Sequence, residues 1–122
     1  MNNKFSCMIY KLVNKEPMPA KSIEEYSEFM SLPNNYIIQQ SLLKDLGVVV
    51  STVFTGFSLE CDDTGAPTLF ETSVYESLTM NEVFYKKYTN YQDAVKGHGK
   101  IIYKIQTSNG VFFNQKVDED AG

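Results

Sequence analysis

Apolar and polar residues follow two different spacings along this chain, and the shorter spacing predicts strands. In residues 68–76, a period of two separates two sets of side chains onto opposite faces: Leu69, Glu71, Ser73 and Tyr75 on one, and Thr68, Phe70, Thr72 and Val74 on the other. Residues 7–13 likewise place Met8, Tyr10 and Leu12 on one face and Ile9 and Val13 on the other. Residues 36–43 and 48–57 contain the β-branched and aromatic residues that are typical of strands. Residues 77–88 fit either a short strand or an irregular segment. We expect 48–57 and 68–76 to pair as a central hairpin.

The longer spacing, in which apolar residues recur every three or four positions, predicts helices. Residues 22–32 show this spacing, and the segment stops before Pro33, which disfavours a helical residue in front of it. Ser22 is followed three positions later by Glu25, the signature of a capping box. The sequence therefore predicts a helix that begins at Ser22.

A second helix is predicted over residues 90–106, after a further capping box at residues 89–92. At 100° per residue, its apolar residues gather on one side together with His98. Gly97 and Gly99 lie inside this helix, and each costs it about 1 kcal/mol relative to alanine. We expect the apolar side, and His98 with it, to point toward the sheet.

These elements combine into one predicted architecture. Hairpin connections favour an antiparallel sheet, and each helix has a single apolar side. The prediction is a two-layer α+β fold, with an antiparallel sheet of four or five strands and two helices on one face, in the order β-α-β-β-β-α. Residues 14–19 should form a turn, because their two prolines cannot continue a ladder, and residues 111–113 should add an edge strand. Residues 1–117 form the predicted domain, and 118–122 a disordered acidic tail.

Composition narrows the classes of protein to which this chain can belong. Of its 122 residues, 43% are hydrophobic, but no apolar run approaches the ~20 residues that a membrane-spanning helix needs. The first residues lack the apolar segment of a signal peptide, so we expect a cytoplasmic protein with free thiols at Cys7 and Cys61. No P-loop, dinucleotide-binding, zinc-protease or hydrolase motif occurs. The sequence therefore predicts no metal, no cofactor and no catalytic residue.

Charge adds one candidate surface. The net charge is −4, and every basic residue is a lysine. Five lysines in the C-terminal half are candidate anion-binding residues: Lys86, Lys87, Lys96, Lys100 and Lys104. The other interpretation is a solvated helix face. Arginine, which reads phosphate and guanine with its planar fork, is absent, and this argues against nucleic acid as a partner.

His98, the only histidine, is the centre of a candidate ligand site. On the apolar side of its helix it needs hydrogen-bonding partners, and Thr52, Thr72 and Glu71 on the two central strands are candidates. One interpretation is a pocket in which Glu71 and His98 form an acid–base pair. The other is a core histidine with satisfied hydrogen bonds. Glu71 is a site residue if its face of the sheet is covered, and a solubilising charge if that face is open.

Three ordered blocks of sequence carry a resemblance to a known family. They are VSTVFTG at residues 50–56, GAPTLFETSVY at 65–75 and YTNYQDAVKGH at 88–98. These blocks resemble an uncharacterised family of small proteins encoded by tailed bacteriophages and prophages. Tyr91 stands where that family usually has Trp, and Ser73 where it has Met. The resemblance implies a phage origin and a location in the host cytoplasm, and it implies no reaction.

The functional hypotheses follow from this resemblance and from the aromatic residues. Sixteen Phe and Tyr residues are more than one small core needs, so we expect an aromatic sheet face that is exposed. The first hypothesis is a non-enzymatic homo-oligomer that binds and blocks a host or defence component through this face and the acidic 60–67 loop. The alternative is binding of a small phosphorylated, nucleotide-like ligand near Glu71 and His98. An enzyme that uses these two residues and a structural role in the virion are also open.

Overall fold

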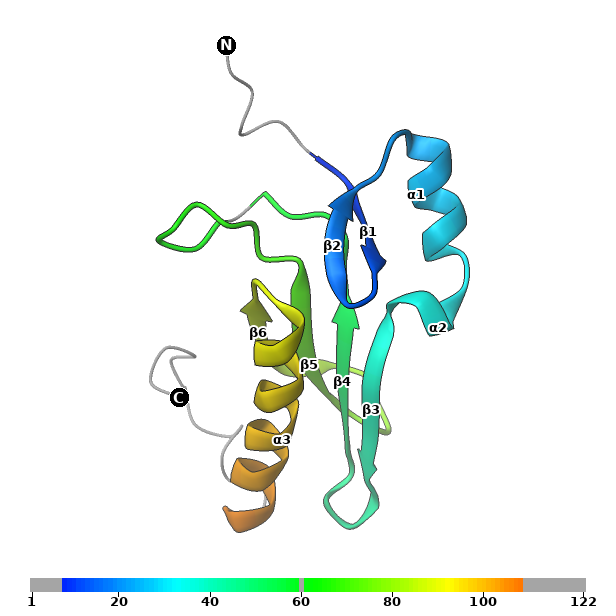
Figure 1. The fold of residues 1–122 in the computed structure, drawn as a ribbon. Coiled ribbons are helices and arrows are strands. Elements are labelled where there is room, and N and C mark those ends of the chain that lie inside the picture. Colours follow the sequence, from blue (N-terminus) through cyan, green and yellow to red (C-terminus); the bar gives the residue numbers. More distant parts are fainter. Residues whose placement is uncertain (1–7, 60, 109–122) are drawn as a thin grey trace.

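A computed structural model of the protein describes residues 8–59 and 61–108. They form a four-stranded antiparallel sheet, a separate two-stranded hairpin and three α-helices (Figure 1). The predicted α+β class is therefore confirmed. Cys7 and the predicted edge strand and tail at 111–113 and 118–122 lie outside the described residues.

The main sheet has the order β3-β4-β5-β6, and each strand runs antiparallel to its neighbours. Its strands are β3 (Ile37–Leu43), β4 (Val48–Phe54), β5 (Phe70–Glu76) and β6 (Glu82–Tyr88). β4 and β5 pair along their whole length without a register shift, so the predicted central hairpin is confirmed. The ambiguous segment 77–88 contains the edge strand β6.

Alternation along the central strands gives this sheet one buried face. Every second residue of β4 is buried, and the residues of β5 directly opposite share that face. Helix α3 (Tyr91–Thr107) lies across it (Figure 1). The residues that α3 buries are Ala94, Gly97, His98, Ile101 and Ile105. The helix side predicted to be apolar is therefore the side that packs on the sheet.

Residues 14–19 do not form the simple turn that their prolines predict. They contain a second strand, so that β1 (Tyr10–Val13) and β2 (Glu16–Pro19) form an antiparallel hairpin. Pro17 and Pro19 are two residues apart on a strand with one neighbour, so both missing N–H groups point away from β1. The prediction failed because a proline whose missing N–H points away from the neighbouring strand leaves the pairing intact.

The hairpin connects to the main sheet at one end. Its two turn residues, Asn14 and Lys15, have φ angles of 51° and 72°, as a type I′ hairpin turn requires. The Tyr10 N–H donates a hydrogen bond to the Gly56 carbonyl at 2.8 Å. Gly56 has a φ of 71°, and a β-carbon there would collide with the Tyr10 carbonyl. Glycine is therefore required where the hairpin meets the chain that leaves β4.

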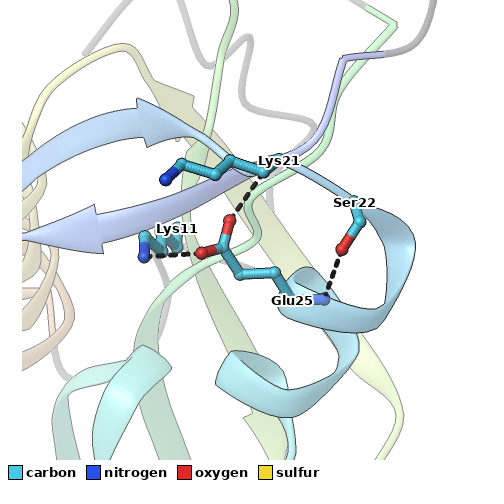
Figure 2. A network of polar contacts seen from close by, with 4 residues as sticks. All are labelled: Lys11, Lys21, Ser22 and Glu25. Carbon is cyan, nitrogen blue, oxygen red and sulfur yellow. Dashed lines mark hydrogen bonds and ion pairs between the residues drawn. The ribbon is translucent and has the colours of Figure 1, made fainter.

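Helix α1 (Ile23–Met30) begins where the capping box predicts. The Ser22 hydroxyl accepts a hydrogen bond from the Glu25 N–H at 3.1 Å. The Glu25 carboxylate accepts the Lys21 N–H at 2.6 Å and pairs with the Lys11 ammonium at 2.9 Å (Figure 2). These two donors lower the pKa of Glu25 below its ordinary value. The same carboxylate thus closes the start of α1 and ties the helix to β1.

Short helical turns and caps join the remaining elements. A single helical turn, α2 (Pro33–Tyr36), follows α1, and a 3₁₀ turn, η1 (Lys44–Leu46), separates β3 from β4. The cap of α3 differs by one position from the prediction. Asn90 rather than Thr89 is the N-cap, and its side chain accepts the Asp93 N–H at 2.8 Å. Asparagine is the stronger cap of the two residues.

Aromatic side chains fill the end of the fold where the hairpin, α1 and α3 meet the sheet. Phe54 and Phe70 are fully buried with ring centroids 5.2 Å apart, and Phe29 of α1 meets Phe54 edge-on at 6.1 Å. Seven aromatic residues belong to this cluster: Tyr10, Phe29, Tyr36, Phe54, Phe70, Tyr88 and Tyr91. Many aromatic residues that we expected on an exposed sheet face are therefore part of the core.

Candidate functional site

A row of polar side chains crosses the buried face of the sheet beneath α3. His98 Nδ1 lies 2.7 Å from the Thr52 hydroxyl, which lies 2.6 Å from the Thr72 hydroxyl on the next strand. On the other side of the ring, Nε2 lies 2.9 Å from the Ser41 hydroxyl of β3. His98, Thr52 and Thr72 are fully buried. The structure thus brings together three predicted site residues and joins α3 to three strands.

The hydrogen bonds of this network fit a neutral histidine. Burial lowers the pKa of His98 below its ordinary value, and no charged group contributes to the shift. A neutral ring has one donor and one acceptor, and the hydroxyls of Ser41 and Thr52 can take either role. Both tautomers therefore leave the two ring nitrogens paired. At pH 7, His98 is an uncharged core residue with satisfied hydrogen bonds.

Ser41 and His98 have the spacing of a nucleophile and its base, but their surroundings do not fit catalysis. A hydroxyl 2.9 Å from a histidine nitrogen is within reach for proton transfer. A nucleophile must also reach a substrate, and four hollows of about 270–420 Å³ on the described surface are lined by other residues. The group that orients the ring at Nδ1 is the Thr52 hydroxyl and not a carboxylate. The geometry supports a core histidine.

Glu71 does not belong to this network. It follows the alternation of β5, one position before Thr72, and lies directly opposite Lys87 of β6. Its side chain therefore points to the face of the sheet away from α3. On that face its carboxylate accepts a hydrogen bond from the Ser73 hydroxyl at 3.3 Å. The predicted pocket between Glu71 and His98 is wrong, because the sheet itself separates the two side chains.

The five candidate anion-binding lysines do not form one surface. Successive residues of a strand point to opposite faces, so Lys86 lies on the α3 side of β6 and Lys87 on the other side. Lys87 is directly opposite a carboxylate of β5, which offsets its charge. Lys96 and Lys100 are exposed on α3, and Lys104 is half-buried there. Lys87 is therefore removed from the predicted anion surface, and the other four stay candidates.

The face of the main sheet away from α3 is the larger candidate surface. No helix in residues 8–59 and 61–108 lies across it (Figure 1). Its middle row runs through Gln40, Ser51, Ser73 and Tyr85, one residue from each strand. Tyr75 and Tyr85 are the aromatic residues that the four strands place on it, and Tyr85 is 45% exposed. The expected aromatic face is thus a mixed face of apolar, aromatic and polar residues.

A hollow of about 320 Å³ lies at one end of this face, where β4 and β5 lead into the connection between them. Glu71 and Lys87 line it from the strands. Phe57 and Leu59 line it from the connection and are 40% and 74% exposed. Apolar surface and charges of both signs are therefore neighbours in one depression, which can receive an apolar side chain with a polar or charged group beside it.

The acidic loop predicted over residues 60–67 is built as a narrow hairpin in its described part. Cys61 and Pro67 form a β-bridge. The Asp62 carboxylate accepts the N–H and the hydroxyl of Thr64, at 2.8 and 2.6 Å, and the Ala66 N–H at 3.1 Å. These hydrogen bonds lower the pKa of Asp62 below its ordinary value. The loop, drawn in green in Figure 1, therefore presents a fixed negative charge.

Two residues of the buried site were not among the predicted ones. Ser41 contacts His98 only because β3 lies next to β4, and nothing in the local sequence of β3 marks Ser41 as a partner of the histidine. The Tyr88 hydroxyl is buried against Gly97 without a hydrogen bond of good geometry to any described residue. Burial raises the pKa of Tyr88, and the nearby Thr72 side chain opposes this effect.

Comparisons of the chain with models of protein families, with curated proteins and with solved structures gave no match. In the described part of the chain, every helix is too short or too polar to cross a membrane. Among the same residues, no group of three His, Cys, Asp or Glu side chains is placed to hold a metal ion. Cys61 is an exposed free thiol. The phage resemblance, the cytoplasmic location and the class of partner stay predictions.

Proposed function

We propose that this chain is a binding protein that docks a protein partner through the uncovered face of its main sheet. The observation that carries the proposal is the hollow that joins Phe57 and Leu59 to the charged residues Glu71 and Lys87. Single exposed apolar residues are ordinary on a protein surface, but here they line a depression. Protein interfaces typically have apolar anchor residues in pockets at their centre and polar or charged residues at the rim, and the hollow offers both kinds of residue side by side.

The same surface indicates the chemistry of the partner. The hollow is suited to an apolar side chain of the partner. Asp62 and Asp63 are exposed on the adjoining loop, so basic groups around that side chain would be attracted and oriented. In keeping with the phage resemblance, we place the partner among host or defence proteins, whose activity the bound chain would block.

Binding of a small phosphorylated ligand has less support. The sheet separates Glu71 from His98, and the hydroxyls of Thr52 and Thr72 are already paired with the histidine or with each other. Native mass spectrometry of gently purified protein tests this alternative. A mass excess of a small molecule that is lost on denaturation would favour it, and the bare mass of the chain or of a symmetric oligomer would count against it.

The substitution Leu59→Asp tests the proposed docking surface. Leu59 is 74% exposed in the hollow, and Leu78, 97% exposed in the turn between β5 and β6, offers the matched control Leu78→Asp. Both variants add one carboxylate at an exposed leucine, so both should fold. We expect a partner captured from a bacterial lysate by the natural chain and by Leu78→Asp, with capture by Leu59→Asp reduced at least about tenfold. Equal capture by both variants would contradict the proposal.

A further inference from the structure

The outer edge of β3 is unpaired in the described part of the chain. β3 is an edge strand of the main sheet. Its inner side pairs with β4, and α2 precedes its N-terminal end (Figure 1). Among the described residues, no backbone hydrogen bond joins residues 38–43 to any element other than β4. A row of unpaired N–H and C=O groups of this kind is a template for a further strand.

The two edges of the sheet differ in the residues that protect against such pairing. β6, the other edge, carries Glu82, Lys86 and Lys87 and has a register shift in its pairing with β5. Charges and bulges on an edge strand oppose the addition of another strand. β3 contains no charged residue and no proline. It has a register shift of its own between Ile37 and Gln39, at its N-terminal end, and its register is regular over residues 39–43. The charged residues are therefore on β6, and the regular part of β3, residues 39–43, is open to a partner strand.

The sequence of β3 indicates which partner strand fits. It reads IIQQSLL, which is two apolar residues, three polar residues and two apolar residues on either side of a centre at Gln40. Two antiparallel copies related by a two-fold axis at Gln40 place each residue opposite its mirror position, so apolar residues meet apolar ones and polar residues meet polar ones. At the axis, Gln40 meets its own counterpart. Its amide has both a donor and an acceptor, so it is complementary to itself.

We propose that the protein forms a symmetric dimer through antiparallel pairing of two β3 strands about Gln40. The two four-stranded sheets then become one continuous sheet. Leu42, which is 61% exposed, comes to lie opposite Ile38 of the second copy, the residue at which the pairing of β3 with β4 shifts its register. The nearest charges after the strand, Lys44 and Asp45, belong to η1 and lie beyond the paired segment. The inference is independent of the proposed function, because the hollow is lined by residues of β5, β6 and their connection to β4.

Oppositely charged substitutions at Gln40 test this pairing. Gln40 is exposed, and among the described residues its side chain bonds only to the Ser51 hydroxyl, at 3.0 Å. Gln40→Lys and Gln40→Glu should therefore leave the core intact. Each variant alone places two like charges opposite each other at the axis, and the equimolar mixture places Lys opposite Glu. Native mass spectrometry and analytical ultracentrifugation should show a natural dimer. The dimer Kd should be at least about tenfold weaker for either variant alone and recover in the mixture.

The matched control lies on the opposite edge of the sheet. Tyr85→Lys adds a lysine to β6 at a position that is 45% exposed, and this variant should stay dimeric. Gln40→Cys, in a chain with Cys7→Ser and Cys61→Ser, should form a disulfide between the two copies under mild oxidation, and it keeps the test decisive if the charged variants unfold. A monomeric natural chain up to its solubility limit, an unchanged Kd for Gln40→Lys, or no disulfide at Gln40→Cys would overturn the proposal.

Discussion

Gly97 and Gly99 should respond in opposite directions to the same substitution. Both lie in the middle of α3, so replacing either with alanine removes the same unfavourable helix propensity, worth about 1 kcal/mol. Their surroundings differ. Gly97 is buried against Tyr88, whereas no heavy atom lies within 4 Å of the β-carbon that alanine would place at Gly99. The pair therefore separates the effect of packing from the effect of backbone propensity.

Packing should outweigh propensity at Gly97. A methyl group there would overlap the ring and the hydroxyl of Tyr88, which is 7% exposed and held in the aromatic cluster, so the helix or the ring must move. Overpacking of this kind costs about 1–3 kcal/mol. We expect Gly99→Ala to raise the free energy of unfolding by about 1 kcal/mol. Gly97→Ala should lower it by up to about 2 kcal/mol, the overpacking cost less the gain in propensity.

Urea unfolding followed by far-ultraviolet circular dichroism measures both changes in free energy. In a thermal scan, 1 kcal/mol corresponds to roughly 4 °C in Tm for a chain of this size. The midpoint should be highest for Gly99→Ala, intermediate for the natural chain and lowest for Gly97→Ala. If Gly97→Ala were as stable as Gly99→Ala, Tyr88 would not pack on α3 at this point, and the assignment of the buried side of the helix would be wrong.

Further predictions concern the buried polar residues and the cap of α1. Because burial lowers the pKa of His98, the unfolded chain binds a proton below about pH 6.5 that the folded chain resists. The free energy of unfolding should therefore fall as the pH drops below that value, by at most about 1.4 kcal/mol per pH unit, and His98→Gln should lose this part of the slope in urea titrations. Thr52→Val leaves His98 Nδ1 buried without its partner and should cost about 1–3 kcal/mol in the same assay. Tyr88→Phe removes a hydroxyl that has no good partner in the described part of the chain, so it should be neutral or stabilising, and a clear loss of stability would reveal a bond. Ser22→Ala should cost about 1 kcal/mol by removing the cap, whereas Ser27→Ala, exposed on the same helix, should have little effect.

The spacing of apolar residues was enough to predict most of the elements, because it depends on local geometry alone. A period of two placed Thr52 and Phe54 on the same side of β4, and a period of 3.6 placed His98 and Ile101 on the same side of α3. These are the apolar sides of β4 and of α3, so we could expect the two sides to pack against each other. The contact between Thr52 and His98 could therefore be predicted as one of a few candidates.

The failures have a different origin, since they depend on what lies next to each element. Alternation separates Glu71 from Thr72, but residues on both faces of β5 are apolar enough to be covered, and only the position of α3 decides which face is buried. β2 was missed because a proline is compatible with a strand that has one neighbour. Ser41 was missed because its partner belongs to a helix far along the chain. The local spacing of apolar and polar residues contains no information about which elements become neighbours in the fold.

The polar row beneath α3 explains why the only histidine of the chain is buried. Thr52 and Thr72 lie opposite each other on the covered face, so two hydroxyls are removed from water within an apolar layer. Leaving them unpaired would be unfavourable, and His98 supplies the hydrogen-bonding partner. A shift of α3 by one turn would place Ala94 or Ile101 over the threonines and leave their hydroxyls with one partner fewer. The network therefore specifies the position of α3 on the sheet, a role that requires His98 to be inaccessible. The proposed docking surface and the proposed dimer contact accordingly use the face and the edge that α3 leaves open.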